Sequence, residues 1–289
     1  ELKIGKAYNF HATIDASNVL GEEGKELQPI EFDVEEVKGW ENGNGYDGGV
    51  IETGLYEKQL RDALAQGLTV ELSQDVVITE PLVVAAGTSS VINLNGYDII
   101  NETKTLEYGE GEGIVVYGDL TINGEGLVKG STRAVWARGN DGATVTINGG
   151  TYEGCEEGYT GGGNSVVYAS SGNVINIYGG TVKALAADKT SYANKTEGVY
   201  AALNVADNNG MINVYGGSFY KQNPAAPGTE PAAWNAAHAN GFVADGYFVE
   251  LVGDYYVVAE APVAKNADDL KALLNDASVD TIVLGAGEF

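Results

Sequence analysis

The sequence predicts an all-β protein folded as a right-handed parallel β-helix, a solenoid in which successive coils of the chain stack on one another. Two observations lead to this fold class. Five similar phrases each end a short extended run at a glycine, and these glycines follow one another at intervals of 28, 25, 30 and 37 residues. A second extended run lies between consecutive phrases. Short strands that repeat every roughly 20 to 50 residues are typical of solenoids, whereas a propeller blade needs about four strands per repeat.

Residues 1–45 are predicted to form an antiparallel β-hairpin. Apolar and polar residues alternate through residues 6–17 and again through 27–40, with the turn-like sequence LGEEGKE between them. Alternation with a period of two indicates strands that bury one face. The sequence ENGNGYDGG at 41–49 is rich in glycine and asparagine and favours a linker.

The main domain is predicted to span residues 46–262 and to begin with a short capping helix at 55–66. Leu60 and Leu64 lie one helical turn apart, and Gly67 follows at a position typical of a helix end. Extended runs begin directly after this segment. The helix is therefore expected to cover the first coil, since an end coil exposes unpaired strand edges.

The body of the main domain repeats one strand-forming phrase, as VINLNGY, DLTINGEG, TVTINGGT, VINIYGGT and MINVYGGS. Alternate residues of each phrase are aliphatic, which indicates a strand with an inward apolar face. The residues between them are short and polar, as expected of an outward face. The predicted inward residues are Ile92, Leu94, Leu120, Ile122, Val145, Ile147, Ile175, Ile177, Ile212 and Val214.

The glycines that end these phrases are predicted to turn the corner between two strands. A positive φ there costs little only for glycine, with asparagine next. The alternative is a phosphate-binding loop, which requires a helix directly after the glycines. The residues after Gly149-Gly150 instead read TYE and continue as a strand. The sequence therefore favours corners.

A row of polar and aromatic residues precedes the corners. It is expected to contain Asn95, Asn123 and Asn148, followed by Tyr178 and Tyr215. Equivalent residues of successive coils stack, so one interpretation is an asparagine ladder closed by two stacked tyrosines. The alternative is an aromatic platform in which the two tyrosines bind sugar rings.

The C-terminal part is predicted to close one module and to open another. The sequence GFVADGYFVELVGDYYVV at 241–258 is expected to be a closing hairpin. Residues 263–289 then repeat the order of the capping helix and its following strand, with Leu270 and Leu274 in place of the two helix leucines and Asn266 as N-cap. We expect a second, truncated solenoid module here, and a chain cut at both ends.

Composition limits the classes of partner. The formal net charge of −25 argues against nucleic acid or an anionic membrane as the main partner. No apolar run approaches the roughly 20 residues that span a membrane. Cys155 is the single cysteine and has no base near it in sequence, so it is expected to be incidental. His11 and His238 lack partners at metal-ligand spacing, so no metal site is predicted.

One charged cluster is the first candidate for chemistry. In STRAVWARGND, Arg133 and Arg138 flank Trp136, Asp141 follows closely, and Glu153 is expected on the next coil. A general acid and base on adjacent coils could act on a polysaccharide. However, no paired outward aspartates occur on consecutive phrases. The sequence therefore predicts no catalytic site, leaves these four charged residues as candidates, and makes Trp136 a candidate ligand contact.

With these repeats, residues from about 68 to 258 resemble right-handed parallel β-helix proteins of the pectate-lyase-like superfamily, in particular repeat proteins of gut Bacteroidetes surfaces. Gly5-Lys6-Ala7-Tyr8 and Gly39-Trp40 resemble the last hairpin of fimbrillin-like domains. Lyases of the superfamily use acidic calcium ligands with a basic residue, and its hydrolases use several aspartates. The lyase motifs are absent here, so the resemblance implies no catalytic residue.

We therefore expect a secreted or cell-surface solenoid that acts in adhesion and binds a polysaccharide, a host or bacterial surface glycan, or another partner without catalysis. One alternative is a polysaccharide lyase or glycoside hydrolase that acts on an acidic polysaccharide. Another is a structural spacer in a tandem surface protein. No cofactor is predicted, and the alternative is calcium held by clustered carboxylates.

Overall fold

The computed structural model divides the chain into two compact units, Glu1–Tyr56 and Glu57–Phe289. Each unit is described by itself. The described residues are 8–13, 31–36, 53–103, 110–139, 142–156, 165–187, 201–206, 209–226, 241–277, 279 and 282–285.

The first unit contains a two-stranded antiparallel sheet. Strand β1 (Tyr8–Thr13) pairs with β2 (Glu31–Glu36), with Tyr8 opposite Glu36 and Thr13 opposite Glu31. The two alternating runs of the sequence therefore pair in the expected antiparallel sense.

The second unit is built mainly from three parallel sheets, which we call sheets 1, 2 and 3. Sheet 1 has the order β18 (Met211–Val214), β15 (Val174–Ile177), β12 (Thr144–Ile147), β9 (Asp119–Asn123), β6 (Ser89–Asn93) and β3 (Thr69–Glu71). Sheet 2 has the order β20 (Tyr247–Val252), β21 (Tyr255–Glu260), β19 (Gly217–Tyr220), β16 (Thr181–Ala184), β13 (Thr151–Gly154), β10 (Leu127–Lys129), β7 (Ile99–Asn101) and β4 (Val76–Ile78). Sheet 3 has the order β17 (Ala201–Val205), β14 (Ser165–Ala169), β11 (Val135–Ala137), β8 (Ile114–Val116) and β5 (Leu82–Val84).

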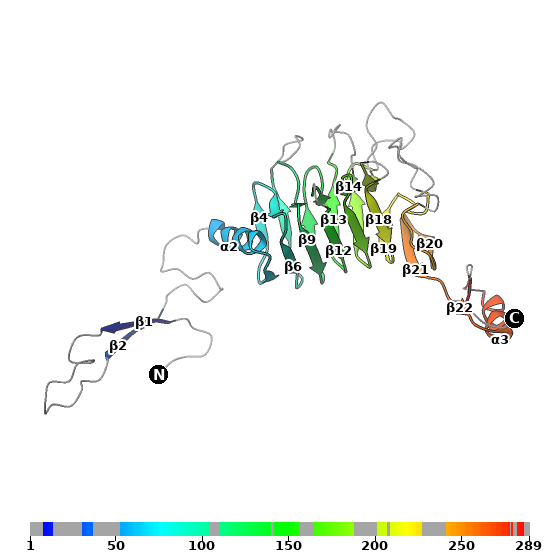
Figure 1. Cartoon of the computed structure of the whole chain (residues 1–289), viewed down its shortest axis with the longest axis horizontal. Helices are drawn as coiled ribbons and strands as arrows, with labels where there is room; N and C mark the ends of the chain where they lie inside the picture. The colour runs from blue at the N-terminus through cyan, green and yellow to red at the C-terminus, as the bar shows by residue number, and fades with distance from the viewer. Residues whose placement is uncertain are drawn as a thin grey trace. The chain divides into compact units, whose positions relative to one another are not determined.

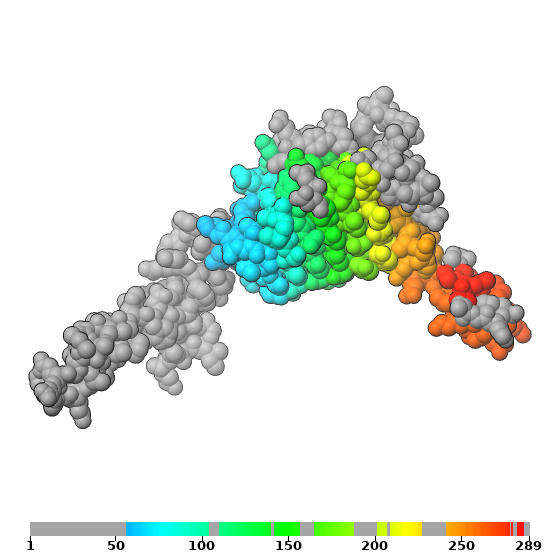
Figure 2. Space-filling view, viewed as in Figure 1, coloured from blue at the N-terminus to red at the C-terminus, as the bar shows by residue number. Residues whose placement is uncertain are grey.

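The chain visits the three sheets in turn, and each visit adds one strand beside the strand of the preceding coil. Thus β3, β4 and β5 form the first coil, and β6, β7 and β8 the second, paired with them in parallel. Figure 1 shows the strands side by side in coil order, and Figure 2 shows the same coils as adjacent bands of colour from cyan to yellow. The predicted all-β, solenoid-like fold with parallel sheets is confirmed.

The core lies between the three sheets. Each predicted inward residue of the five phrases is at most 2% exposed. In sheets 1 and 2 buried and partly exposed residues alternate, as in β12 and β13, so these sheets bury one face. Sheet 3 differs, because β8, β11 and β17 are buried at every position. These three strands therefore bury both faces, whereas Val83 in β5 is 42% exposed.

The corners use glycine for two separate reasons. Gly180 has a φ of 97°, in the region that side chains with a Cβ avoid. A Cβ at the preceding Gly179 would lie 2.9 Å from the carbonyl oxygen of Asn148 in the neighbouring coil. Adjacent coils therefore approach closely at the corner, as strands spaced about 4.8 Å apart require.

The outward row of sheet 1 differs from the expectation at its first member. Register pairs Asn93, not Asn95, with Asn123. Asn95 lies in the corner itself, with a φ of 54°. The structure therefore shifts the first phrase, VINLNGY, by two residues relative to an alignment of the phrases on their glycines. A shift of two residues keeps every side chain on the same face of the strand.

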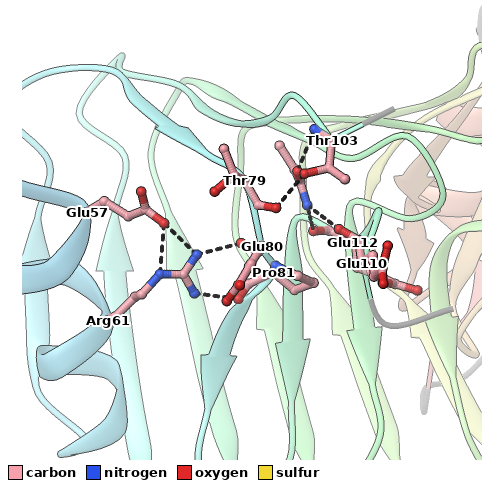
Figure 3. A network of polar contacts seen from close by, with 9 residues as sticks. Glu57, Arg61, Thr79, Glu80, Pro81, Thr103, Glu110 and Glu112 are labelled. Atoms are coloured by element: carbon pink, nitrogen blue, oxygen red, sulfur yellow. Dashed lines mark hydrogen bonds and ion pairs between the residues drawn. The ribbon is translucent and has the colours of Figure 1, made fainter. Parts of the chain in front are cut away.

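Helix α2 (Thr53–Ala65) covers the first coil. Leu60 and Leu64 are buried at 3% and 0% exposure, and Ser90 Oγ in β6 donates to the Leu64 carbonyl oxygen at 3.1 Å. The Arg61 guanidinium holds Glu57 on its own helix and donates at 2.6 Å to each of the Glu80 and Pro81 carbonyl oxygens after β4 (Figure 3). These hydrogen bonds hold α2 against the first coils of the solenoid.

The other end of the stack is closed by antiparallel pairing. Strand β21 runs antiparallel to β19, and β20 pairs antiparallel with β21, so a hairpin occupies the last edge of sheet 2. In sheet 1, Val214 forms a parallel bridge with Val243, and its amide donates to the Phe242 carbonyl oxygen. Both of these final strands are therefore covered.

The C-terminal segment contains β22 (Val263–Ala264), α3 (Ala267–Leu274) and β23 (Val283–Leu284), with β22 and β23 parallel. Asn266 caps α3, since its side chain accepts a hydrogen bond from the Asp269 amide. No residue of α3 is buried, and Leu274 is 70% exposed. Leu274 is therefore exposed where its counterpart in α2, Leu64, is buried, and Leu270 is half-buried.

Among the described residues, no helix has the length and apolar character needed to cross a membrane.

Candidate functional site

The tyrosines predicted to end the outward row of sheet 1 do stack on each other. The rings of Tyr178 and Tyr215 lie 4.6 Å apart between centroids at an interplanar angle of 8°, and Tyr247 meets Tyr215 edge-on at 5.6 Å. Tyr178 is 52% exposed. Each ring of the stacked pair covers one face of the other, so those two faces are closed to a ligand. A sugar that stacks flat needs an open ring face.

The same row is a hydrogen-bonded ladder in its earlier coils. Asn123 Nδ2 donates to Asn93 Oδ1 at 2.8 Å, and Asn148 Nδ2 donates to Asn123 Oδ1 at 2.7 Å. Glu71 accepts hydrogen bonds from Asn95 and Asn93, which hold the pKa of its carboxyl below the usual value. The polar part of this row therefore joins coils to one another.

Arg133 is buried completely and forms an ion pair with Glu112 of the preceding coil. The distance from Arg133 Nη1 to Glu112 Oε1 is 3.4 Å, and both side chains have no exposed surface. The guanidinium carbon lies 4.7 Å from the ring centroid of Trp136 and 4.6 Å from that of Tyr168. Aromatic faces attract cations, so two rings and one carboxylate together stabilise this charge away from water.

The segment that carries Glu112 is itself anchored. Asn101, at the end of β7, is 3% exposed, and its side-chain amide donates to the carbonyl oxygens of Glu110 and Glu112 at 2.9 and 2.6 Å. The amide of Thr103 in turn donates to Asn101 Oδ1 at 2.9 Å (Figure 3). The segment that supplies the Glu112 carboxylate is therefore anchored within its own coil.

The charged residues proposed for catalysis are distributed over different surfaces. Glu153 lies on the outer face of β13, opposite the buried Tyr152, and is in register with Lys129 and Lys183 of the adjacent strands. Arg133 is buried with Glu112. Asp141 lies outside the described residues. The structure therefore brings Arg133 and Arg138 to one ring, that of Trp136, and leaves Glu153 on another sheet.

Trp136 and Arg138 form the outer part of this cluster. The Arg138 guanidinium carbon lies 4.2 Å from the Trp136 ring centroid, and the Arg138 side chain is exposed. Trp136 is 7% exposed, and its Nε1 donates to Ser170 Oγ at 2.9 Å. A single indole ring thus contacts a buried arginine and an exposed one.

Glu112, Tyr168 and Ser170 complete the cluster, and sequence reasoning did not single them out. They come from the coils before and after Arg133, so only the strand register of sheet 3 identifies them as neighbours. The usable signal in the sequence is the repeated extended run, which carries Tyr168 and Ser170 and begins directly after Glu112.

Buried hydroxyl and thiol groups near the cluster are held neutral. Burial raises the pKa of the Cys155 thiol to about 12, and the charge of Arg133 opposes this shift. Burial also raises the pKa of Tyr152, whose hydroxyl donates to the Gly149 carbonyl oxygen at 2.9 Å. Neither group is ionised near neutral pH. His11 belongs to β1, and His238 lies outside the described residues.

In the part of the chain that the structure describes, no group of three or more His, Cys, Asp and Glu side chains could hold a metal ion. No protein-family model matches the chain, and comparisons with curated proteins and solved structures likewise found no match. Its function is therefore inferred from its own side chains.

Proposed function

We propose that the chain is a right-handed parallel β-helix of the pectate-lyase-like type and a non-catalytic binding module of a secreted or cell-surface protein. It would act in adhesion, by binding a glycan or another partner. The three stacked parallel sheets and the closed end of the stack support the fold assignment. The resemblance to gut Bacteroidetes surface proteins and to fimbrillin-like domains remains part of this proposal.

One observation carries the functional proposal, namely how the chain uses the two arginines around Trp136. Arg133 is buried in an ion pair, where it has no contact with solvent and therefore none with a polymer. Arg138 is exposed on the same ring. The arrangement thus supports recognition at the surface more than proton transfer. Tyr178 adds a second exposed aromatic group, on sheet 1.

We propose the domain boundaries as follows. The solenoid module covers residues 46–262, with α2 as its N-terminal cap and the segment from 241 through the β20–β21 hairpin as its closure. Residues 1–45 belong to a preceding domain, and residues 263–289 begin a second module.

A glycan array with the whole chain tests the binding function. We expect wild-type protein to bind a defined subset of glycans, and Tyr178→Ala with Tyr215→Ala to weaken binding if the tyrosines contact the ligand. Loss of binding in Arg138→Gln but not in the tyrosine double variant would assign recognition to the arginine cluster. Absence of binding to every glycan would contradict the glycan-binding function.

The enzymatic alternative has its own measurement. Incubation with acidic polysaccharides should give no new ultraviolet absorbance from unsaturated uronate products and no new reducing ends. Product release that disappears in Glu153→Gln or Arg138→Gln would overturn the non-catalytic proposal.

A spacer in a tandem array is the second candidate function, and the C-terminal helix favours it. Leu270 and Leu274 of α3 occupy the positions of Leu60 and Leu64 in α2, yet Leu274 is 70% exposed. An apolar face of this kind suits a cap that covers a further coil. The spacer function predicts no glycan binding at all, which separates it from adhesion.

A further inference from the structure

We infer that Arg138, with hydroxyl groups on the two adjacent coils, forms a binding site for a single carboxylate, that of an acidic sugar at the end of a glycan chain. A terminal sialic acid has this chemistry. This inference rests on the proposed glycan-binding function and specifies its ligand class.

Within the described part of the chain, the Arg138 guanidinium has hydrogen-bond donors without a protein acceptor. Across the described part of the chain, no side chain or carbonyl group accepts a hydrogen bond from it, and no carboxylate forms an ion pair with it. Its only side-chain interaction there is the contact with the Trp136 ring. A lone surface arginine would be expected to pair with a carboxylate, particularly in a chain with 41 acidic residues. Among the described residues nothing accepts from its five N–H groups, which can therefore bind a ligand.

The ring under Arg138 is fixed on several sides. Trp136 Nε1 is bonded to Ser170 Oγ, and Tyr168 packs against Trp136 edge-on with ring centroids 6.3 Å apart. Arg133, paired with Glu112, contacts the same ring from within the protein. An arginine held on a fixed aromatic ring loses less conformational freedom when it binds a ligand than one that extends into water.

Residues that carry hydroxyl groups occupy the positions equivalent to Arg138 on the two adjacent coils. Ala137 is in register with Val116 on one side and with Ala169 on the other, so the next residues, Tyr117, Arg138 and Ser170, occupy equivalent positions on three successive coils. The backbone confirms this alignment, since the Arg138 amide donates to Val116 and the Ser170 amide to Ala137.

These two hydroxyl groups can bind the polar groups of a sugar. Ser170 Oγ accepts the Trp136 hydrogen bond and keeps its own hydrogen to donate. Tyr117 is half-buried and offers a second hydroxyl on the preceding coil. A planar guanidinium matches a carboxylate through two parallel hydrogen bonds, and hydroxyl groups on either side match sugar hydroxyls.

Among the positions equivalent to Arg138 on successive coils of sheet 3, only Arg138 itself carries a positive charge. The ligand is therefore limited to one carboxylate. The equivalent positions before and after the three residues are Ala85 and Ala206. A polyuronate lying along the stack would place a carboxylate on several coils, where it would meet no further arginine and a protein of net charge −25. A chain end that carries a single acidic sugar avoids this repulsion.

Titration calorimetry with the whole chain tests the inference. The probes are sialyllactose, lactose, sulfated lactose and an oligogalacturonate, compared for wild type, Arg138→Gln and the control Lys183→Gln. The control also removes one positive charge, but from the outer face of sheet 2. Circular dichroism checks that each variant is folded, as expected for substitutions of these side chains.

We expect wild type to bind sialyllactose at least about tenfold more tightly than lactose or the oligogalacturonate. Arg138→Gln should remove this preference, and Lys183→Gln should keep it. Binding should weaken as salt is raised, because the site is exposed.

Three results would overturn the inference while leaving glycan binding intact. They are equal affinity for lactose, tighter binding of sulfated lactose or oligogalacturonate, and sialyllactose affinity unchanged in Arg138→Gln. Failure of all four probes, together with an array that shows no binding, would instead reject the proposed function along with the inference.

Discussion

At the residue scale, the Arg133–Glu112 pair places two opposite charges where water is excluded. Removing charges from water costs several kcal/mol per ion, and this cost is offset only when each charge keeps good partners. Here the partners include the opposite charge and, for Arg133, the rings of Trp136 and Tyr168. The pair therefore tolerates the loss of both members better than the loss of one.

We predict that Arg133→Met or Glu112→Leu alone lowers the free energy of unfolding by about 3–5 kcal/mol, because each leaves a buried charge without its counter-ion. The double substitution should cost less than the sum of the two. Urea denaturation of the four proteins gives the coupling energy. Additive effects would mean that the pair is not coupled.

Cys155 provides a second prediction at this scale. Since burial raises its pKa to about 12, the thiol should react with a disulfide reagent at mildly alkaline pH only when the protein unfolds. Because of the raised pKa, the Cys155 thiol stays protonated up to a higher pH in the native state than in the unfolded state. This contribution to stability is therefore complete below the reference pKa of 9.0 and decreases from there to about 12. Fast labelling under native conditions, compared with the rate in urea, would contradict the burial of this thiol.

At the scale of single elements, the corners can be tested with two glycines of similar backbone conformation. Gly172 and Gly180 have φ values of 79° and 97°. A Cβ at Gly172 would meet no atom within 4 Å, whereas one at Gly180 would lie 2.6 Å from the Gly150 carbonyl oxygen.

Gly172→Ala should lower the free energy of unfolding by about 1–2 kcal/mol, the cost of a left-handed backbone. Gly180→Ala should cost about 1–3 kcal/mol more, because the neighbouring coil must also move. Thermal and urea unfolding of both variants measure the difference. Equal effects would show that coil spacing does not limit this position.

The two helices allow a matched comparison of the same residue in two environments. Leu64→Ala in α2 should lower the free energy of unfolding by about 2–5 kcal/mol, since this side chain has no exposed surface. Leu274→Ala in α3 should change it by less than about 0.5 kcal/mol. A similar loss in both variants would show that the α3 leucine is covered in solution.

The elements also show what the sequence could and could not predict. Period-two alternation correctly identified the buried aliphatic residues of the five phrases. The alternation could not decide whether Asn93 or Asn95 belongs to the outward row of sheet 1. A shift of two residues leaves each side chain on the same face of the strand. The Arg133–Glu112 pair was missed for a related reason. Segments of variable length separate the strands of sheet 3, so sequence spacing does not give their register.

At the scale of the whole molecule, the second unit is a stack in which each coil contacts mainly its neighbours. Its stability then depends on closed ends, because the last strand of a parallel stack leaves unpaired backbone groups. Here α2 covers the first coil, and the β20–β21 hairpin pairs with β19. Because β21 occupies the free edge of β19, no other strand can pair with β19 there.

We predict that a chain ending at Gly246 self-associates, because the edge of β19 becomes available to another molecule. A chain ending at Pro262 keeps the hairpin and serves as the control. Size-exclusion chromatography with light scattering should show larger species for the shorter chain only. The same mass distribution for both would mean that the hairpin does not protect this edge.

The regular register of the stack also bears on how such a protein can evolve. Asp119 and Thr144 occupy equivalent positions, so a gene that lost the segment from Asp119 through Ala143 would join Gly118 to Thr144 and leave neighbouring coils with matching strands. That segment contains Arg133, Trp136 and Arg138. Duplication or deletion of one coil could thus add or delete these three residues of the recognition surface without changing the scaffold around them. Evolution could then gain or lose whole coils as units. The binding specificity of related proteins could therefore change faster than their fold.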